Sequence, residues 1–376
     1  MVVDEITWGG RDPRSEIPVI QVYLLKKMFS HAPLLPPTVI FHLTHRYNID
    51  SDPSRVNLGV GAYRDAQLKP VVFSAVRKAE EALASAGNNK EYLPISGIAE
   101  FRKESAKLLF GSGCKALSEG RVASVQTLSG TGSLTVAAHF LRRLLPNSRV
   151  FCSDPTWENH GKVIADAGAG GSLGLEYYRY YDPKTCSLDE EGFLSDLGAI
   201  PEGSVVLLHA CAHNPTGVDP TREQWRRVGD LMKRRKLMPW FDIAYQGFAS
   251  GDLDEDAWAV RHFLETGFEM IVSQSFAKNM GLYCERVGGL HVVCSNASSA
   301  AAVLSNIEAI VRPMYSNPPA HGARIVTHIL TNSELKKVRK IPPTPPSPHT
   351  HTPAFTRLCM PPLLPHSLSA PPSQNL

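Results

Sequence analysis

Two residues in loops that follow apolar runs, Asp242 and Lys278, could do chemistry together. Asp242 ends the apolar run 237–242, and a carboxylate there is costly to bury without a cationic partner. A protonated pyridine nitrogen would be such a partner. A lysine in a loop such as 273–279 is ordinarily a solvated charge, but a lysine facing Asp242 across a ring would be a Schiff-base nucleophile. The pair therefore suggests a site for a flat, cationic ring.

Small and hydroxyl-bearing residues follow an earlier apolar run. Residues 128–132 read LSGTG and precede a segment with the pattern of a helix. Free backbone N–H groups at a helix N-terminus, together with the hydroxyls of Ser129 and Thr131 and the close approach that Gly130 allows, would bind a phosphate. An ordinary helix cap explains the same residues equally well.

Two further loops carry residues that could contact a ring. Trp157, in the stretch 154–160, could stack on a ring face, although an isolated tryptophan more often belongs to the core. Asn214, in the stretch 212–217, could donate a hydrogen bond to a ligand oxygen, whereas Asn-Pro and Thr-Gly pairs are also typical of a turn. His209, Cys211 and His213 would point to one side of an extended strand, but no fourth ligand is apparent, so we expect no metal site.

These loops must be held by a regular framework. Strand-like and helical runs alternate from about residue 55, and such alternation predicts parallel β-α-β units with right-handed crossovers. We expect strands at 124–128, 149–153, 204–209, 237–242, 269–273 and 287–294, and helices at 132–145, 158–167 and 221–236. Thr221 and Gln224 have the spacing of a capping box at the start of the last helix. Ligands collect beyond the carboxyl ends of such strands, which is where the candidate residues lie.

Composition limits the class of protein. The chain has 376 residues, 43% of them hydrophobic, and a net charge of +3, too mild to argue for a nucleic acid or an anionic membrane as partner. No apolar run is long enough for a transmembrane helix. Seven scattered cysteines without a CxxC pair favour neither a disulfide framework nor a zinc module. Composition therefore predicts a globular body in a reducing compartment, followed by a proline-rich tail.

The stretches together, in this order and spacing, resemble the aspartate aminotransferases, pyridoxal-phosphate enzymes of the large aminotransferase fold class. The resemblance covers residues 55–335. Its strings are NLGVGAYR at 57–64, EYLP at 91–94, DPTWENH at 154–160, HNPTG at 213–217, DIAYQGFA at 242–249, SFAKN at 275–279 and RPMYSNPPA at 312–320.

The resemblance implies a role for each matching residue. Lys278 would bind pyridoxal 5'-phosphate covalently and then carry the proton of the reaction, while Asp242 would keep the pyridine nitrogen protonated. Asn214 and Tyr245 would donate to the ring oxygen, and Trp157 would stack on the ring. The phosphate would lie among Ser129, Gly130, Thr131, Ser275 and Arg286. Position 277 is alanine, where many relatives have serine.

The resemblance also implies a homodimer. In the family, Tyr92 reaches the phosphate of the neighbouring subunit, and Arg312 pairs with the side-chain carboxylate of that subunit's substrate. Gly61 would close over the substrate, and Trp157 and Asn214 would also contact it. The implied reaction converts L-aspartate and 2-oxoglutarate to oxaloacetate and L-glutamate by a ping-pong mechanism. We expect small dicarboxylic amino acids and 2-oxo acids as substrates, and neither a nucleic acid nor a membrane as partner.

The end of the chain departs from the family pattern. Eleven of the 29 prolines fall in residues 341–376, where Arg357 is the only charged residue. We interpret this tail as intron read-through or a shifted frame, with a proline-rich docking tail as the alternative. The second substrate arginine of the family has no match, so an impaired enzyme or a non-catalytic interaction protein is one alternative function.

We expect a three-layer α/β/α large domain with a mostly parallel sheet and an incomplete small domain. The expected divisions are an extended or disordered arm at 1–54, a cofactor-binding domain at 55–335 and the non-family tail at 336–376. An aromatic amino-acid aminotransferase of the same fold is a further alternative. No clean transit peptide is visible, so we expect a cytoplasmic location, with mitochondria as the alternative.

Overall fold

A computed structural model describes residue 29 and residues 32–35, 39–57, 61–65, 69–168 and 173–338 of the chain. The chain divides into two compact units, Met1–Val60 and Gly61–Leu376. In the first unit, helix α2 (Val39–Ile49) lies within the segment expected to be extended, and the Arg55 guanidinium lies 5.1 Å from the centre of the Tyr47 ring. The proline-rich tail at 341–376 lies outside the described residues.

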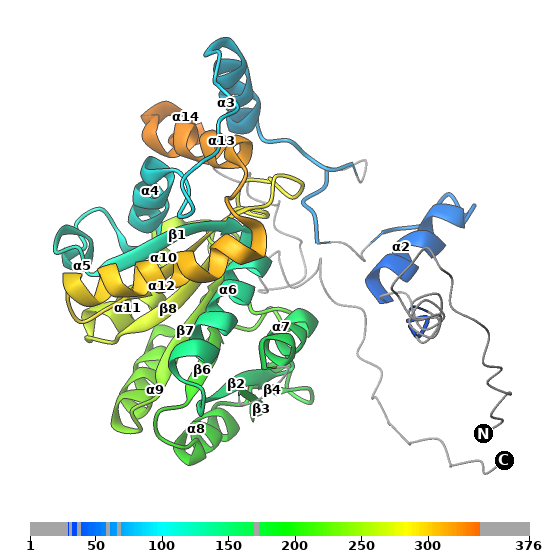
Figure 1. Cartoon of the computed structure of the whole chain (residues 1–376). Helices are drawn as coiled ribbons and strands as arrows, with labels where there is room; N and C mark the ends of the chain where they lie inside the picture. Colours follow the sequence, from blue (N-terminus) through cyan, green and yellow to red (C-terminus); the bar gives the residue numbers. More distant parts are fainter. Residues whose placement is uncertain are drawn as a thin grey trace, which may run out of the picture. The chain divides into compact units, whose positions relative to one another are not determined.

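The second unit is built on a seven-stranded sheet (Figure 1). The strand order is β1-β9-β8-β7-β6-β2-β3. The strands are β1 (Val122–Leu128), β2 (Arg149–Asp154), β3 (Gly174–Arg179), β6 (Val205–His209), β7 (Met238–Ile243), β8 (Met270–Ser275) and β9 (Val287–Val293). A short hairpin of β4 (Tyr181–Asp182) and β5 (Ser187–Leu188) forms separately.

The sheet is mixed, although most neighbouring strands run parallel. The pairs β2–β3, β2–β6, β6–β7 and β7–β8 are parallel, as the alternation of strands and helices predicts. Only strand β9 is antiparallel to its neighbours, β1 and β8, so the sheet is mostly parallel, as expected. The physical reason for the direction of β9 is that the loop between β8 and β9 contains no helix to return the chain across the sheet for a parallel pairing.

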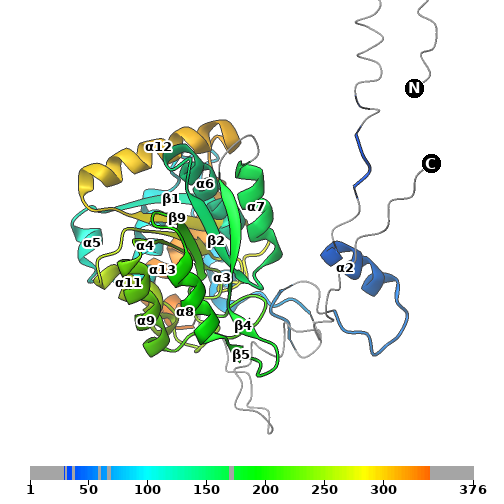
Figure 2. The same ribbon diagram turned by 90° about the horizontal axis from the view of Figure 1, so that it is seen from below.

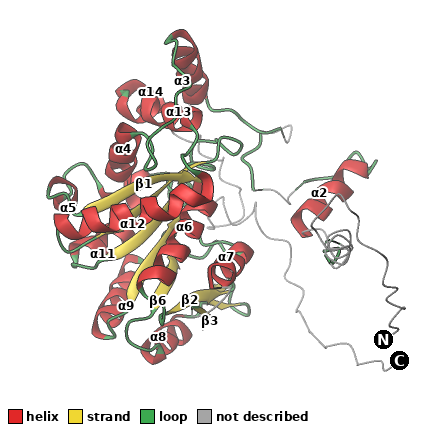
Figure 3. Cartoon of the chain, viewed as in Figure 1, coloured by secondary structure: helices red, strands yellow, loops and turns green. Residues whose placement is uncertain are grey.

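Helices cover both faces of the sheet, and Figures 2 and 3 show the resulting layers. One face packs against α6 (Ser129–Leu144), α7 (Glu158–Gly168) and α12 (Ala297–Tyr315). The other packs against α4 (Ala99–Phe110), α8 (Glu190–Ala199), α9 (Arg222–Arg234) and α11 (Trp258–Glu265). Two short helices, α5 (Lys115–Ser118) and α10 (Leu253–Asp256), lie in connecting loops. The expected three-layer α/β/α architecture is confirmed.

A third cluster of apolar residues joins helices from both ends of the second unit. Helices α3 (Ser74–Ser85), α13 (Ala320–Thr331) and α14 (Ser333–Val338) pack together with α4. Ala79 of α3 and Ile325 and Ile329 of α13 are fully buried there. Segments far apart in sequence therefore close one side of the domain.

The central strands are apolar on both sides because each side meets a helical layer. In β6, Val205 and Leu207 belong to the cluster with α6, whereas Val206 and Leu208 belong to the cluster with α9. All four side chains are at most 1% exposed, and each contributes roughly 1.5–3 kcal/mol on burial. This core holds the strand ends, and with them the candidate site, in fixed positions.

The first residues of two helices can be compared with the sequence prediction. The predicted capping box of α9 is confirmed, since Thr221 Oγ1 accepts from Gln224 N at 3.2 Å and Gln224 Oε1 accepts from Thr221 N at 2.8 Å. Helix α6 begins at Ser129, three residues earlier than predicted, so the small residues after β1 form its first turn. Among the described residues, no helix is long and apolar enough to span a membrane.

Candidate active site

The site lies at one edge of the sheet, where the ends of several strands meet. The parallel strands end there at their carboxyl termini, and antiparallel β9 begins there, so Arg286 lies directly before Val287 at the same edge. A pocket enclosing about 550 Å³ of empty space, including its open mouth, opens at this edge. Its lining residues are Ser129, Gly130, Thr131, Leu134, Trp157, His209, Cys211, Asn214, Asp242, Ala244, Tyr245, Ser275, Ala277, Lys278 and Arg286.

Ten of the thirteen site residues predicted from the sequence line this one pocket. The other three are Gly61, Tyr92 and Arg312, which do not line it. The Tyr92 side chain is 83% exposed, and Arg312 is exposed near the end of α12. A position facing solvent in a single chain is compatible with the expectation that both side chains act in a neighbouring subunit.

Asp242, near the carboxyl end of β7, is buried, and its two oxygens have different surroundings. Oδ2 accepts a hydrogen bond from His160 Nε2 at 3.1 Å, whereas Oδ1 is buried with no hydrogen-bond partner. Burial by itself raises the pKa of Asp242, but the hydrogen bond from His160 and the nearby His209 and Lys278 outweigh it, so the pKa lies below its ordinary value. Asp242 therefore presents an ionised, unsatisfied oxygen to the pocket, as a carboxylate awaiting a cationic donor would.

A chain of hydrogen bonds behind Asp242 fixes its orientation. His160 Nδ1 bonds Thr156 Oγ1 at 2.8 Å, and Thr156 Oγ1 bonds His209 Nε2 at 3.1 Å. His209 Nδ1 in turn accepts from the backbone N–H of Asn214 at 3.3 Å. Burial and the neighbouring His160 lower the pKa of His209 to about 3, so its ring is neutral. This network could not be predicted from the sequence. Its only local signal is the four-residue spacing of Thr156 and His160, which places the two side chains within hydrogen-bonding distance.

Lys278 and Tyr245 both line the pocket and lie close together. The Lys278 Nζ atom lies 5.5 Å from the centre of the Tyr245 ring. The segment with Gly61 also approaches here, since a Cβ on Gly61 would lie 3.9 Å from Tyr245 Oη. This segment is held by Tyr63, whose N–H donates to Tyr283 Oη at 2.7 Å. An amine and a phenol are thus near one another at the pocket.

The small residues after β1 meet the end of β8 and the start of β9. Ser129 Oγ and Ser275 Oγ are 3.0 Å apart, and Ala277 N donates to Ser275 Oγ at 3.2 Å. A Cβ on Gly288 would lie 2.6 Å from the Ser129 carbonyl carbon, so only glycine permits this approach. Hydroxyls and the first turn of a helix therefore converge in a small cradle suited to an anion.

Three residues in or beside the pocket lining have a strained backbone. Ser129, Ala212 and Arg286 have φ angles of 63°, 47° and 50°, in the left-handed region that non-glycine residues seldom adopt. Each costs of order 1–3 kcal/mol and persists because the surrounding contacts over-determine it. Arg286 is further tied by a hydrogen bond from Nη1 to Tyr283 O at 2.8 Å. Strain of this kind is common at binding sites.

The histidines considered as metal ligands have other partners. His213 Nε2 bonds Ser153 Oγ and His213 Nδ1 bonds Thr216 Oγ1, both at 2.8 Å, and its ring stacks on Tyr180 with centroids 4.0 Å apart. Both ring nitrogens of His213 are therefore hydrogen-bonded to hydroxyl groups. Within the described part of the chain, no group of three or more His, Cys, Asp or Glu side chains has an arrangement that could hold a metal ion.

The pocket fits a phosphorylated pyridine ring at both ends. The unpartnered oxygen of Asp242 suits a ring N–H, and the cradle of Ser129, Gly130 and Ser275 suits a phosphate. Trp157 and Lys278 line the space between these ends, where a ring and a reactive carbonyl would lie. The donor set therefore matches pyridoxal phosphate, whose aldehyde a lysine can bind covalently.

Comparison with known proteins agrees with this geometry. The family profile described as "Aminotransferase class I and II" matches residues 53–341. A mitochondrial aspartate aminotransferase of Xenopus tropicalis is 54% identical over 310 residues, which is 82% of this chain and 72% of the relative. A chloroplastic aspartate aminotransferase of Arabidopsis thaliana is 51% identical over 302 residues, covering 80% and 66%.

Solved structures agree as well. The cytoplasmic aspartate aminotransferase of Saccharomyces cerevisiae has a TM-score of 0.80 at 43% identity and covers 84% of this chain and 77% of its own. An aromatic-amino-acid aminotransferase of Burkholderia pseudomallei, covalently bound to pyridoxal phosphate, has a TM-score of 0.80 at 42% identity, with coverage of 83% and 77%. The chain belongs to the class I and II aminotransferase family, a family of pyridoxal-phosphate enzymes, and its relatives at 51–54% identity are aspartate aminotransferases.

Two buried neutral histidines should make the protein sensitive to acid. Burial lowers the pKa of His209 and of His291 to about 3, whereas an unfolded histidine titrates near 6.5. The unfolded chain therefore binds more protons as the pH falls below about 6.5, and each histidine removes about 2 kcal/mol of stability between pH 7 and pH 5. Burial raises the pKa of Asp219 to about 6. The folded protein therefore takes up a proton at Asp219 on acidification, which offsets about 1 kcal/mol of the stability lost at the histidines.

Urea unfolding at pH 7 and pH 5 would measure this effect. We expect a net loss of at least about 2–3 kcal/mol on acidification, because burial also lowers the pKa of His213 well below its ordinary value and adds to the loss. The loss should be smaller in His291→Gln, which cannot take up the proton. Equal stability at the two pH values, or an unchanged pH dependence in the variant, would show that these histidines do not control acid unfolding.

Proposed function

We propose that the chain is an aspartate aminotransferase that transfers an amino group between L-aspartate and 2-oxoglutarate, giving oxaloacetate and L-glutamate. The observation that carries this proposal is the pocket in which the unpartnered oxygen of Asp242, the Lys278 amine and the Ser129–Ser275 cradle face the same space. The names of the relatives support aspartate as the amino donor.

In this proposal, each end of the pocket holds one end of pyridoxal phosphate. Asp242, oriented by His160, would hold the proton on the ring nitrogen, and Asn214 and Tyr245 would donate to the ring oxygen. Trp157 would lie against the ring face. The phosphate would be held by Ser129, Gly130, Thr131, Ser275 and Arg286. When bound, the cofactor supplies a cationic ring that stabilises negative charge at the substrate α-carbon.

Lys278 would act twice. Its amine would bind the cofactor before substrate arrives, and after substrate has replaced it the same amine would move a proton from the substrate α-carbon to the acceptor carbon. The low pKa of Asp242 supports this arrangement, because an ionised carboxylate keeps the ring cationic at neutral pH. Gly61, close to Tyr245, would cover the substrate and help exclude water.

An assay of the recombinant protein tests the proposal. Oxaloacetate formed from L-aspartate and 2-oxoglutarate is measured by coupled NADH oxidation, and a ping-pong mechanism predicts parallel lines in double-reciprocal plots. Phenylalanine replaces aspartate in a second arm, because a solved relative of 42% identity acts on aromatic amino acids by its name. Absence of turnover with aspartate would overturn the proposal, and turnover with phenylalanine alone would indicate an aromatic amino-acid aminotransferase instead.

We further propose a homodimer in which Arg312 and Tyr92 complete the neighbouring subunit's site. Both side chains are exposed in the single chain, so they are free to reach a neighbouring subunit. There the planar guanidinium of Arg312 could bind a substrate carboxylate through two hydrogen bonds. The proposed compartment is the cytoplasm, as for the yeast relative, although two relatives are mitochondrial and chloroplastic. Subcellular fractionation distinguishes these locations.

Arg312→Leu should change substrate selectivity. Loss of one partner of a desolvated charge pair costs about 2–5 kcal/mol, so kcat/KM for aspartate should fall by roughly 30- to several-thousand-fold, while that for phenylalanine changes much less. Arg226→Leu, at an exposed arginine of α9 that pairs with Glu223, is the control. An equal loss for both donors would mean that Arg312 does not recognise the side-chain carboxylate.

We retain the proposed division into an arm at 1–54, a cofactor-binding domain at 55–335 and a separate tail from 336. Limited proteolysis tests it. A stable fragment beginning near residue 55 and ending near residue 335 is expected, and cleavage first inside the sheet would contradict the division.

A further inference from the structure

Two carboxylates, Asp219 and Asp256, lie behind the pocket and do not line it. Both line a second hollow, together with Trp225 and Trp258. Cys211 lines both the second hollow and the cofactor pocket, so the loop that contains it separates the two. These carboxylates have no place in the reaction proposed above.

Asp219 holds the loop that carries Asn214. Its Oδ2 accepts from Ala212 N at 2.6 Å and its Oδ1 accepts from His213 N at 2.9 Å. Ala212 has a φ of 47°, which is unfavourable for a residue with a side chain. The two charge-assisted bonds stabilise this conformation immediately before Asn214, and each carboxylate oxygen is committed to one of them.

Asp256 holds the loop that follows Tyr245. Its Oδ2 accepts from Gly247 N at 2.7 Å and Ala249 N at 3.0 Å, and its Oδ1 accepts from Ser250 N at 3.0 Å and Ser250 Oγ at 2.6 Å. Asp256 is only 5% exposed. Four donors on one buried carboxylate are characteristic of a group that organises a loop, and a neutral side chain of the same shape could not accept all of them.

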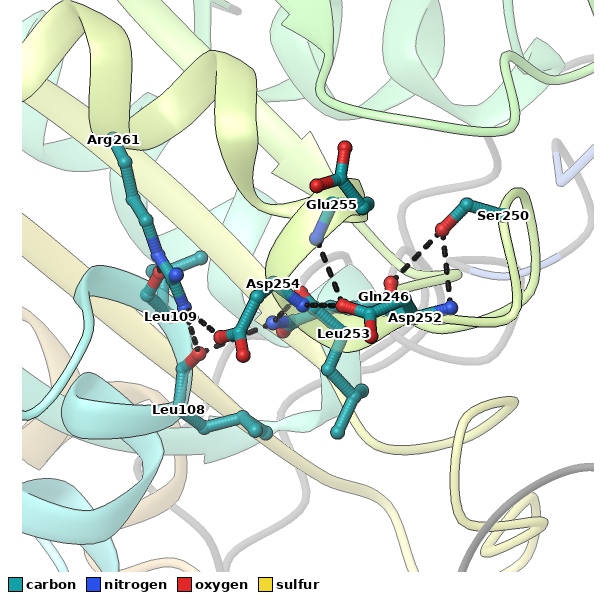
Figure 4. Close-up of polar contacts among 9 residues, drawn as sticks. All are labelled: Leu108, Leu109, Gln246, Ser250, Asp252, Leu253, Asp254, Glu255 and Arg261. Atoms are coloured by element: carbon teal, nitrogen blue, oxygen red, sulfur yellow. Dashed lines mark hydrogen bonds and ion pairs between the residues drawn. The ribbon is translucent and has the colours of Figure 1, made fainter.

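The rest of this loop is anchored to helix α4 (Figure 4). Gln246 Nε2 donates to Leu108 O at 3.1 Å and to Leu253 O at 3.0 Å. Arg261 donates to Leu108 O and Leu109 O at 3.2 and 2.9 Å and contacts Asp254 at 2.7 Å. These contacts fix the outer part of the loop, which leaves Asp256 to fix the part next to Tyr245.

We propose that Asp219 and Asp256 are positioning residues that set the hydrogen bonds of Asn214 and Tyr245 to the cofactor's ring oxygen. Asn214 directly follows His213, and Tyr245 is two residues before Gly247, so the bound backbone groups determine where both donors lie. This inference rests on the proposed function and extends it to residues that touch neither cofactor nor substrate.

The neighbouring titratable groups remain neutral near pH 7, so they do not confuse the test. Burial raises the pKa of Cys211 and of Tyr180 well above their ordinary values and lowers that of His213 well below. The charged residues Arg222 and Glu255, which also line the second hollow, pair with each other. Asp219 itself has a pKa of about 6, raised by burial and to a lesser extent by Asp256, so the two single variants report on the pair of carboxylates.

The test uses full-length Asp219→Asn and Asp256→Asn loaded with pyridoxal phosphate. It measures the cofactor dissociation constant and the pH at which the absorbance of the bound cofactor changes. Donors to the ring oxygen favour its deprotonated form, so their displacement should raise this pH. Removing a nearby negative charge should by itself lower it. We expect a rise, with the dissociation constant increased about tenfold, as for loss of one hydrogen bond to a charged group.

Two matched variants control for the loss of an aspartate. Asp182→Asn alters an exposed turn carboxylate that accepts from Lys184 N and Thr185 Oγ1, in a hairpin without site residues. Asp230→Asn removes an exposed charge on α9. Neither should shift the titration. If an Asn variant fails to fold, Ser250→Ala, which removes one of the four donors to Asp256, should give a smaller shift of the same sign.

The outcomes separate this inference from the proposed function. The variants could melt at a lower temperature and yet titrate and bind cofactor as the wild type does. The carboxylates would then be merely structural, which would overturn this inference but not the proposed function. A fall in the titration pH would do the same, because it reports charge rather than position. A wild-type protein that binds no pyridoxal phosphate would overturn both.

Discussion

Lys278→Ala should reduce kcat/KM for aspartate by about 10,000-fold or more, because one amine supplies both the covalent attachment and the proton transfer. The Lys278 amine lies beside the Tyr245 ring in a pocket that also contains Asp242. Without it, substrate and cofactor meet with no base at the α-carbon. The coupled assay gives the loss of activity, and absorbance spectra give the loss of the covalent link.

Two further variants make this result specific. Lys278→Arg keeps the positive charge but cannot form the covalent link, so it should be as inactive as the alanine variant. Lys162→Ala removes an exposed lysine of α7 that pairs with Glu158 and should retain full activity. Activity retained in Lys278→Arg would mean that charge alone suffices. An absorbance band that survives in Lys278→Ala unchanged would favour a protein that binds the cofactor by other contacts.

Asp242→Asn should lower kcat/KM by roughly 30- to several-thousand-fold, corresponding to about 2–5 kcal/mol for a broken desolvated charge pair. The reason is that Asp242 Oδ1 is buried without a partner and would be left facing the ring nitrogen as a neutral amide. The cofactor-free protein should also lose some stability, because the ionised carboxylate, whose pKa lies below its ordinary value, stabilises the fold at neutral pH through its hydrogen bond from His160.

The comparison of cofactor-free and cofactor-bound stability therefore checks the assignment. Pyridoxal phosphate should raise the melting temperature of the wild type more than that of Asp242→Asn. Asp230→Asn, an exposed aspartate of α9, is the control and should behave as the wild type. Equal activity in Asp242→Asn and the wild type would mean that Asp242 does not hold the proton on the ring nitrogen.

The order of strands and helices could be predicted from the sequence because apolar runs of two periods alternate along the chain. Asp242 and Asn214 could also be predicted as candidates, since Asp242 ends such a run and Asn214 lies in the loop after another. Arg286 differs from these residues because it precedes a strand instead of following one. It lies at the site only because β9 is antiparallel to its neighbours. The sequence predicted a mostly parallel sheet but gave no indication of which strand would be antiparallel.

Other parts of the site depend on contacts between segments that are distant in sequence. The link from Asp242 through His160 and Thr156 to His209 needs β2, β6 and β7 side by side, which no local pattern specifies. The same is true of Asp219 and Asp256, whose carboxylates read as ordinary turn and helix residues. Their roles arise from backbone N–H groups that only the folded loops present.

The pairing of β1 with β9 also bears on how the protein is made. Leu128 pairs with Val287, and within the described sheet β1 has no other neighbouring strand. On the ribosome, β1 must therefore wait until the chain has been synthesised beyond Val293 before its backbone is paired. Such long-range closure is slow, and an unpaired apolar edge promotes aggregation meanwhile. Nascent chains that stop before β9 should accordingly depend on chaperones, whereas those that contain it should acquire protease resistance in one late step.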